Sequence, residues 1–339
     1  MLYRYSMLFG LAATLLTACA VETPQTLGVT SQSAARVVFD TPAPASAKLG
    51  IYVSGYGGSN DTVPFVMGFA EQNRQNQPPI CSEDVTSVAD VAADEKGDLV
   101  AATGKSGVEI FAGPEMCGAE LGTIDETVGD AVDAASIDAA NGPIVVAVVS
   151  EEGDSGSLLV CTLKNGCTTN LHNPAMHEVV SVALAKNGDC WASSNPVVLT
   201  YFKGCSGAGE TATGYENPYP GGLDMDKDGN LVSISTQIIG SKGNTVPLSA
   251  PTYAVYVYSG CRPACKRIGG PYSLEGQAIY GHLNANSTAF AVADYRLEQI
   301  DVYKYTPRAL IYEYSFNNGL FESSIKGVTY NRRSEEQVR

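Results

Sequence analysis

The sequence predicts an all-β protein, a six-bladed β-propeller that follows a signal peptide and a flexible tether. Hairpin-like stretches recur along the chain, and no amphipathic helix of useful length occurs after residue 20. The two ends of the repeating region also carry complementary parts of one repeat. A period of about 40 to 50 residues with four strands in each unit is typical of propellers.

Each repeat opens with two strands that alternate apolar with small or polar residues around a tight turn. Copies begin at Val88, Ala134, Val179, Gly221, Tyr280 and Ile325, the last two being weaker. Their turn positions are Gly97, Gly142, Gly188, Gly229, Ser287 and Ser334. Successive turn positions are 45, 46, 41, 58 and 47 residues apart. Third strands are predicted from Val108, Leu158, Val198, Tyr253 and Gln299, and a fourth strand from Leu310.

The ends of the repeating region predict how the ring closes. The last repeat stops after its first strand, near Tyr330, whereas LGIYVSG from Leu49 and VPFVMGFA from Val63 are a second and a third strand without a first. Joining them completes a sixth blade and removes exposed sheet edges. Residues 49–332 therefore form one propeller domain, with a tail at 333–339. A β-sandwich with accidental periodicity is the alternative.

The N-terminus predicts export. Arg4 precedes an apolar run from Met7 to Leu16, which is too short for a bilayer span of about 20 residues. Leu16-Thr17-Ala18-Cys19 resembles the lipobox of bacterial lipoprotein precursors. This resemblance implies a signal peptide at 1–18 and acylation of Cys19, for example by palmitate. With Ala20 next, it implies the outer membrane. An ordinary secretory signal is the alternative.

Residues 19–48 are rich in Thr, Ser, Ala, Pro and Gln and predict a flexible, lipidated tether. A flexible chain of this length would hold the domain about 30 Å from the membrane on average. The expected location is therefore extracytoplasmic, on a bacterial membrane.

The cysteines indicate the same compartment. Without Cys19, the nine cysteines become an even set of eight, as disulfide bonding in an oxidising compartment requires. Turn signals favour Cys161 with Cys167, Cys190 with Cys205 and Cys261 with Cys265, leaving Cys81 with Cys117 by elimination. Zinc binding is the rival interpretation, but His172, His177 and His282 do not fall into a paired ligand spacing.

The formal charge limits the partners. It is −15 for the whole chain and becomes −16 when Arg4 leaves with the signal peptide. This charge disfavours nucleic acid and anionic membrane surfaces. The expected partners are the membrane, through the lipid, and a protein or glycan ligand, and the expected state is a monomer.

No catalytic motif is complete in this sequence. In a propeller, the residues just before each first strand surround one mouth of the central channel. These candidates for a binding site are Asp90, Asp133, His177, Glu178, Tyr219, Tyr280, His282 and Lys326. Two long loops, Ser54–Thr62 and Thr236–Thr252, are expected beside them. Acidic groups next to histidines could hold a divalent cation or perform acid–base chemistry.

One motif suggests calcium. Asp224-x-Asp226-x-Asp228-Gly229-Asn230 resembles the start of a calcium loop, but Ser235 stands where an EF-hand requires an acidic ligand. The motif also falls on a predicted turn, where Asp and Asn are common for conformational reasons. No cofactor is therefore assigned, and Ca²⁺ or Zn²⁺ is the candidate cation.

The recurring D-x-x-G-N-L-V type hairpins resemble those of NHL and SMP-30/gluconolactonase-like propellers. The stretches GGLDMDKDGNLVSIS, VYVYSGC and IDVYKYTP (Ile300 to Pro307) are similar to those of uncharacterised bacterial propeller lipoproteins. The resemblance spans roughly residues 49–332. The lactonase-like relatives hold a channel metal through acidic and Asn side chains, and no such set can be matched here.

Two functions follow as hypotheses. The first is a non-enzymatic binding or scaffolding module on a lipid tether. The second is a metal-dependent lactonase or hydrolase of the SMP-30-like type.

Overall fold

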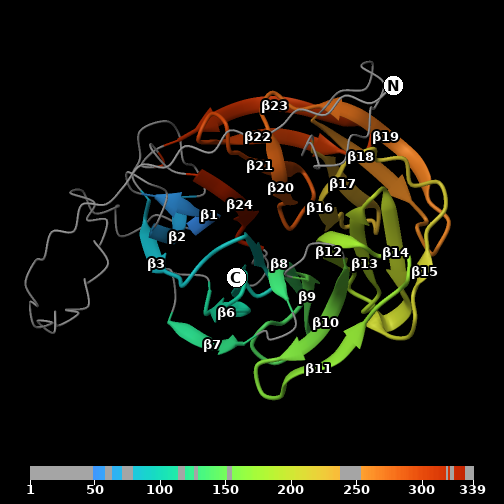
Figure 1. The fold of residues 1–339 in the computed structure, drawn as a ribbon. Coiled ribbons are helices and arrows are strands. Elements are labelled where there is room, and N and C mark those ends of the chain that lie inside the picture. The colour runs from blue at the N-terminus through green and yellow to red at the C-terminus, as the bar shows by residue number, and fades with distance from the viewer. Residues whose placement is uncertain are drawn as a thin grey trace, which may run out of the picture. The chain divides into compact units, whose positions relative to one another are not determined.

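Six four-stranded sheets form the blades of a β-propeller (Figure 1). The computed structural model describes residues 49–57, 63–70, 79–113, 119–125, 129–150, 155–236, 253–317, 320 and 324–332. All of them belong to the unit Phe39–Arg339. The predicted fold class is confirmed. The predicted signal peptide at 1–18, the tether at 19–48 with Cys19, and the tail at 333–339 lie outside the described residues.

Each blade runs from an innermost strand at the channel to an outermost strand at the rim. Blade 1 contains β24 (Ser324–Tyr330), β1 (Leu49–Gly57), β2 (Val63–Ala70) and β3 (Cys81–Asp84). Blade 2 contains β4 (Asp90–Ala93), β5 (Leu99–Ala102), β6 (Val108–Phe111) and β7 (Glu120–Ile124). Blade 3 contains β8 (Asp130–Ser136), β9 (Ile144–Val149), β10 (Gly156–Thr162) and β11 (Gly166–Leu171).

The other three blades follow the same order. Blade 4 contains β12 (Glu178–Leu184), β13 (Cys190–Asn195), β14 (Val198–Phe202) and β15 (Glu210–Thr211), with a 3₁₀ turn at Lys203–Cys205. Blade 5 contains β16 (Pro220–Met225), β17 (Leu231–Ser235), β18 (Ala254–Ser259) and β19 (Lys266–Ser273). Blade 6 contains β20 (Ala278–Leu283), β21 (Ala289–Asp294), β22 (Gln299–Thr306) and β23 (Ala309–Phe316).

The C-terminal strand closes the ring as predicted. β24 pairs with β1 in antiparallel register, with Val53 opposite Val328 and Ile51 opposite Tyr330. Blade 1 is thus built from both ends of the described chain. The six innermost strands contact one another in a closed cycle around the channel. Closure pairs β1 on both sides, so blade 1 has no unpaired strand between its inner and outer edges.

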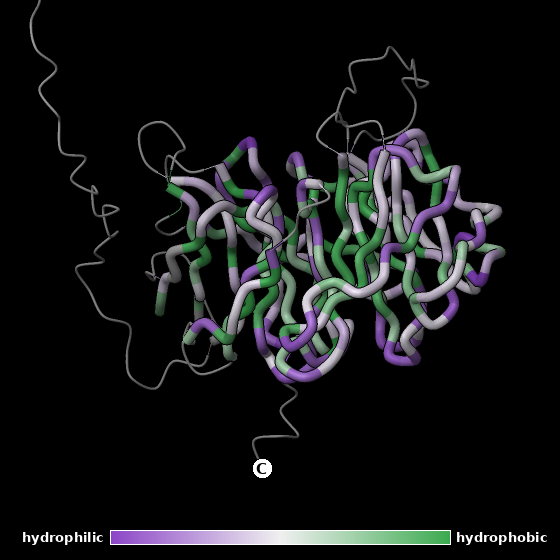
Figure 2. Tube along the Cα trace, turned by 60° about the horizontal axis from the view of Figure 1, so that its bottom comes forward, coloured by the Kyte–Doolittle hydropathy of each residue, from purple (hydrophilic) through white to green (hydrophobic). Residues whose placement is uncertain are grey.

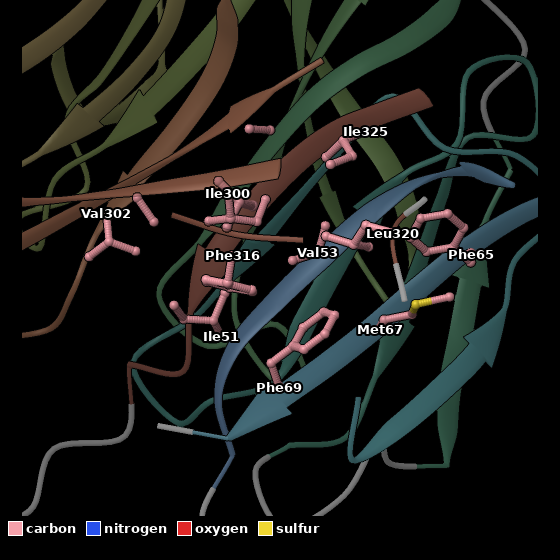
Figure 3. Packing of buried hydrophobic residues seen from close by; sticks show 13 residues of the cluster. Ile51, Val53, Phe65, Met67, Phe69, Ile300, Val302, Phe316, Leu320 and Ile325 are labelled. Atoms are coloured by element: carbon pink, nitrogen blue, oxygen red, sulfur yellow. The ribbon is translucent and has the colours of Figure 1, made fainter. Parts of the chain in front are cut away.

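The hydrophobic core is divided among the blade interfaces. Six clusters of buried side chains occur in the described part of the chain, each joining two neighbouring blades. Figure 3 shows the cluster that joins blades 6 and 1, in which Phe69 packs edge-to-face on Phe316 with ring centroids 5.4 Å apart. Burying one such side chain stabilises the fold by roughly 1.5 to 3 kcal/mol. Figure 2 shows hydrophobic residues along the strands and hydrophilic residues in many connecting turns.

Aspartates build two of the turns between first and second strands. Asp94 Oδ1 accepts hydrogen bonds from the backbone N–H groups of Lys96 and Asp98 at 2.8 and 2.9 Å. Asp226 Oδ1 does the same for Asp228 and Asn230 at 3.0 and 2.8 Å. The repeating D-x-x-G pattern is therefore turn chemistry, in which a short acidic side chain satisfies the backbone.

The first strand of the N-terminal pair is longer than expected. The sequence predicts a loop from Ser54 to Thr62, but β1 continues to Gly57, which pairs with Val63. Tyr56 explains the extension, because its hydroxyl lies 2.6 Å from Ser87 Oγ and accepts the Val88 N–H at 3.0 Å. These contacts attach the end of β1 to blade 2.

Candidate functional site

The innermost strands are irregular where they line the channel. Five of the six carry a β-bulge among the described residues, and the extra residues lie at Val132, Val180, Gly221–Gly222, Ile279–Tyr280 and Lys326. A bulge turns side chains away from the regular alternation of a strand and is frequent near functional sites. Here bulges occur in the strands that carry Asp133, Ser181, Asp224, Tyr280 and His282.

A buried ionic cluster crosses the channel between blades 2, 5 and 6. His282 on β20 has Nε2 3.5 Å from Asp90 Oδ2 and Nδ1 3.5 Å from Asp224 Oδ2. Arg332, just after β24, places Nη2 2.7 Å from both carboxylate oxygens of Asp224. The Leu283 N–H also donates to Asp224 Oδ2 at 2.7 Å. We call Asp90, Asp224, His282 and Arg332 the channel cluster.

The electrostatics of the channel cluster keep His282 positively charged. Burial by itself lowers the pKa of His282, but the carboxylates of Asp224 and Asp90 outweigh it and raise the pKa to about 10. Burial by itself raises the pKa of Asp224, but Arg332 and His282 hold it well below its usual range. Because His282 stays protonated at neutral pH, it cannot act there as a general base.

Asp133 on β8 is a second buried carboxyl group in the channel. Its Oδ2 accepts hydrogen bonds from Ser181 Oγ and, at 2.8 Å, from the Val182 N–H, both in blade 4. Burial and the nearby charge of Asp90 raise the pKa of Asp133 well above its usual value. Ser181 Oγ in turn accepts the Leu223 N–H of blade 5 at 2.8 Å, so this network joins three consecutive blades.

Asp90 differs from the other carboxyl groups in the channel. Neither of its oxygens accepts a hydrogen bond among the described residues, and the residue is 1% exposed. A Cβ at Gly327 would lie 2.1 Å from Asp90 Oδ1, so only glycine leaves room for this carboxylate beside β24. The Asp90–His282 ion pair therefore depends on a close approach of two inner strands.

Tyr280 crosses the channel next to blade 5, whose inner strand carries no side chain at Gly221 and Gly222. Its hydroxyl donates to the Val180 carbonyl of blade 4 at 3.0 Å. Blade 5 carries only Gly221 and Gly222 at its bulge, and Cβ atoms there would lie 2.9 Å and 3.2 Å from the Ile279 carbonyl. The pair of glycines therefore makes room for β20, and Tyr280 helps to fill the channel.

The structure brings four of the predicted mouth residues together and leaves the other four apart. Asp90, Asp133, Tyr280 and His282 interact in the channel. His177 and Glu178 are exposed, while Tyr219 and Lys326 are partly buried outside the channel cluster. The expectation that the candidates precede the first strands is wrong for six of them. Asp133, Tyr280, His282 and Lys326 lie within inner strands, and Asp90 and Glu178 are the first residues of β4 and β12.

Three residues of the channel were not predicted. The sequence places Asp224 in a calcium-like motif, Ser181 in no motif, and Arg332 at the end of the domain without a role. The sequence holds one signal for Asp224. It precedes the turn aspartate Asp226 by two residues, which places it near the end of a predicted first strand, and first strands line the channel. Arg332 had no such signal, since its contact with Asp224 spans 108 residues of sequence.

The calcium-like motif does not form a metal site. Asp224 faces Arg332 in the channel, Asp226 caps a turn, and Asp228 is exposed. Among the described residues, one acidic group has ligand atoms close enough for a metal, and it consists of Asp94 and Asp98 from the β4–β5 turn together with Asp138, which lies between β8 and β9 of blade 3. Its carboxylates already accept backbone N–H groups, such as Gly113 N–H at 2.9 Å from Asp98 Oδ1. The channel residues likewise do not fit the metal of the lactonase-like propellers, because Arg332 neutralises Asp224.

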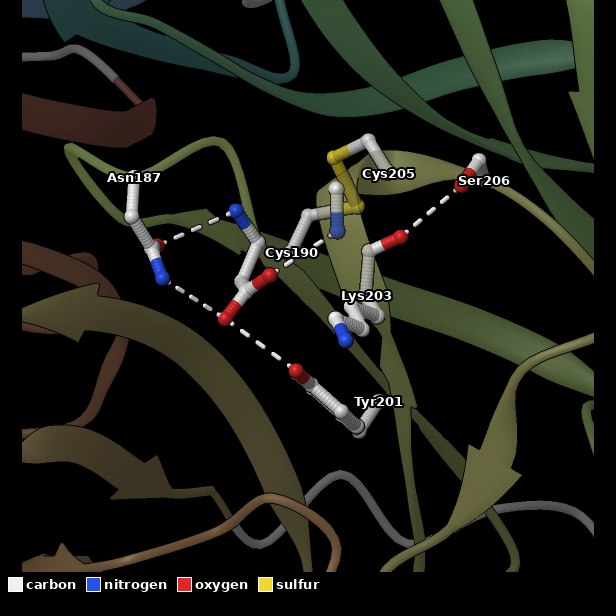
Figure 4. The surroundings of a disulfide bond; sticks show 8 residues. Asn187, Cys190, Tyr201, Lys203, Cys205 and Ser206 are labelled. Carbon is white, nitrogen blue, oxygen red and sulfur yellow. Dashed lines mark hydrogen bonds between the residues drawn. A yellow bond between two sulfur atoms is a disulfide. The ribbon is translucent and has the colours of Figure 1, made fainter.

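Three of the predicted disulfides are present. They join Cys161 with Cys167, Cys190 with Cys205 and Cys261 with Cys265. Cys81 is disulfide-bonded, and Cys117 lies outside the described residues. Beside the second bond, Asp189 accepts the Tyr201 hydroxyl at 3.1 Å and the Gly204 N–H at 2.8 Å (Figure 4).

Comparison with known proteins identifies the fold. No family model matches the chain, and no curated protein matches it. Solved propellers do. A candidate 6-phosphogluconolactonase from Bacteroides fragilis has 11% identity and a TM-score of 0.51, covering 86% of this chain and 99% of its own. A protein of unknown function from Bacteroides caccae has 9% identity and a TM-score of 0.55, covering 84% and 99%.

A chain of the nidogen–laminin complex is also similar, with 8% identity, a TM-score of 0.56, and coverage of 84% of this chain and 100% of its own. The chain is a six-bladed β-propeller. At these identities the likeness concerns the fold alone, because one fold supports many activities. In the part of the chain that the structure describes, no helix is long and apolar enough to cross a membrane.

Proposed function

We propose that this chain is a lipid-anchored, extracytoplasmic propeller that acts as a binding or scaffolding module. Three disulfides support an oxidising compartment, where such bonds persist. The lipobox-like segment that ends at Cys19 supports a lipid anchor, and Ala20 supports the outer membrane. The acidic composition supports a protein or glycan ligand rather than nucleic acid.

A single observation carries the non-enzymatic part of the proposal. The titratable groups that converge in the channel are engaged with one another: His282 lies between two carboxylates, and Asp224 is held by Arg332. A general base must be unprotonated and within reach of a substrate proton. The channel cluster instead fastens blades 2, 5 and 6 to the C-terminal segment, as expected for a rigid scaffold that binds through its faces.

Cell fractionation tests the anchor. The Cys19→Ser variant should move from the membrane fraction to the soluble extracytoplasmic fraction, because it lacks the acylated residue. The Ala20→Asp variant is the matched control and should remain membrane-bound but shift toward the inner membrane. A Cys19→Ser protein that stays in the membrane fraction would contradict lipid anchoring.

Activity assays test the absence of catalysis. The purified full chain should not hydrolyse lactones or simple esters above the rate of buffer. Turnover that disappears in a Glu178→Gln variant would show an enzyme. Glu178 is a fair test position because it is exposed and outside the channel cluster.

The second candidate is a metal-dependent lactonase or hydrolase. The observation in its favour is the similarity to the structure from Bacteroides fragilis, at 11% identity. Metal analysis of the purified chain separates the two candidates, since this enzyme requires a stoichiometric divalent cation such as Ca²⁺ or Zn²⁺. A chain without one would eliminate the lactonase.

A further inference from the structure

Blade 3 contains a small open cavity outside the channel cluster. The cavity measures about 230 Å³ and lies where β9 ends, β10 begins and β11 ends. Its lining residues are Val148, Ser150, Ser155, Gly156, Ser157, Asn170 and His172. At about 30 Å³ for each water, this volume equals roughly seven or eight waters, which is smaller than a typical drug-sized pocket. Residues 151–154 lie outside the described residues and are not part of this site.

Small side chains open this cavity. In the β9–β10 hairpin, the third-strand residues nearest the loop are Gly156 and Ser157, opposite Val149 and Val148. At the same two places the hairpins of blades 2, 4, 5 and 6 have larger pairs: Val108 and Glu109, Val198 and Leu199, Ala254 and Val255, Gln299 and Ile300. At Ser157 blade 3 thus carries a smaller side chain than blades 2, 4, 5 and 6 do, whereas the side-chain position of Gly156 is filled by Val179 of blade 4.

Gly156 also brings the cavity close to blade 4. An added Cβ would lie 2.5 Å from the Val179 side chain and 2.7 Å from the His177 carbonyl, so β10 approaches the start of β12 as only glycine permits. The Gly156 carbonyl accepts a hydrogen bond from His172 Nδ1 at 3.2 Å. In the neutral ring, this bond leaves Nε2 as a hydrogen-bond acceptor.

The lining chemistry selects the ligand. Serine hydroxyls, an asparagine amide and an imidazole each donate and accept hydrogen bonds without a formal charge. The described residues that line the cavity include no lysine, arginine, aspartate or glutamate, so none of them offers a counter-ion to a phosphate, a carboxylate or an ammonium group. The net charge of −15 further disfavours anions. A neutral molecule rich in hydroxyl groups matches these partners.

We propose that this blade 3 cavity binds one neutral sugar unit through its serines, Asn170 and His172. The proposal rests on the binding-module function above and specifies its ligand. The sugar could be a free monosaccharide or one residue of a glycan chain, and both offer the same hydroxyl pattern. The small volume favours a single ring over a longer segment inside the cavity.

Saturation-transfer NMR on the full chain, in a detergent without sugar groups, tests the proposal. The probes are glucose, galactose and N-acetylglucosamine, with glucuronate and glucose 6-phosphate as charged counterparts. A β-linked disaccharide separates the two sources, because a glycan site should bind it at least as well as the monosaccharide. At least one neutral sugar should bind, and the charged counterparts should bind more weakly.

Exposed positions provide the variants. Asn170→Ala and His172→Ala should each weaken binding about fivefold to tenfold, as the loss of one hydrogen bond implies. Thr169→Ala is the matched control, since Thr169 is exposed on β11 next to Asn170 but does not line the cavity, and it should bind as wild type does. All three variants should keep the wild-type melting temperature.

The outcomes separate this proposal from the function on which it rests. Failure of every neutral sugar to bind the folded chain would overturn the sugar site, as would equal binding by Asn170→Ala, His172→Ala and wild type. Stronger binding of the charged sugars would overturn the ligand class. These outcomes are independent of the activity assay. The binding-module function is contradicted only by lactone turnover, so the two proposals can fail separately.

Discussion

At the scale of single residues, the most informative group is His282. It lies 3.5 Å from a carboxylate on each side, is buried with Asp90 and Asp224, and carries a positive charge at neutral pH. A buried charge is stable only when it is paired. The pairing partners come from blades 2 and 5, so one imidazolium connects three parts of the ring.

Removing Arg332 should destabilise the propeller. Arg332→Met leaves Asp224 with only His282 as its positive partner, and the expected loss is about 2 to 3 kcal/mol because Arg332 is partly exposed. Urea unfolding measures this loss. Arg308→Met is the control at an exposed turn arginine, and it should change stability by less than about 0.5 kcal/mol.

A double-mutant cycle checks that Arg332 acts through Asp224. The Asp224→Asn/Arg332→Met protein should be more stable than the sum of the two single losses implies, because neither charge is then left unpaired. Strict additivity would contradict the pairing.

The raised pKa of His282 predicts a pH dependence. An unfolded histidine loses its proton near pH 6.5, but the folded one keeps it until about pH 10. Between these values the folded state holds the extra proton, so stability falls as pH rises. Between pH 7 and pH 9 the wild type should lose about 2 to 3 kcal/mol more than His282→Gln does, by urea unfolding at both pH values. Parallel profiles would contradict the assignment.

At the scale of elements, inner and outer strands differ in their environment. Inner strands are mostly buried and carry bulges beside Asp133 and at Tyr280, both of which face the channel. Outer strands face solvent and carry edge protection. β15 has only two residues, and β11 is joined to β10 by the Cys161–Cys167 bond. β23 is the apolar exception, with Ile311 57% exposed.

The two disulfides within blades 3 and 4 should differ in their contribution. The Cys161–Cys167 bond closes a separation of 6 residues and the Cys190–Cys205 bond one of 15. Restriction of the unfolded chain grows with loop length, so removing the longer bond should cost about 1 kcal/mol more. Thermal unfolding of the Cys161→Ala/Cys167→Ala and Cys190→Ala/Cys205→Ala proteins measures this difference. The inverse order would contradict the loop-length account.

At the scale of the whole molecule, stability depends on closure. β24 supplies the innermost strand of blade 1, and Arg332 directly after it binds Asp224 on blade 5. The end of the described chain is therefore attached to both sides of the ring.

A truncation series tests this closure. A chain that stops after Arg332 should unfold cooperatively with wild-type stability, because it retains β24 and the arginine. A chain that stops after Tyr330 should lose about 2 to 3 kcal/mol with Arg332. A chain that stops after Ser323 should fail to give a cooperative transition by calorimetry, since blade 1 then lacks its inner strand. A stable, cooperative protein from this last chain would contradict strand closure.

The repeats were predictable because local rules produce them. Alternating apolar residues and turn residues predicted the hairpins, and the incomplete first and last repeats predicted the closing strand. Turn signals likewise predicted the local disulfide Cys161–Cys167. The channel cluster was only half predictable. Asp90 and His282 are candidates from their places near first strands, but Asp224 and Arg332 are not, because their contact joins residues 108 positions apart in the sequence.

By itself, the sequence determined the all-β class, the six repeats and the closing strand, because periodicity and turn chemistry act over a few residues. Only the tertiary structure decided which charges meet. Asp224 and Arg332 are 108 residues apart, and their contact exists because ring closure brings β24 across from β16. The cavity of blade 3 is likewise a feature of the tertiary structure. The small size of Gly156 and Ser157 becomes informative only when they are compared with the residues at the same places in blades 2, 4, 5 and 6.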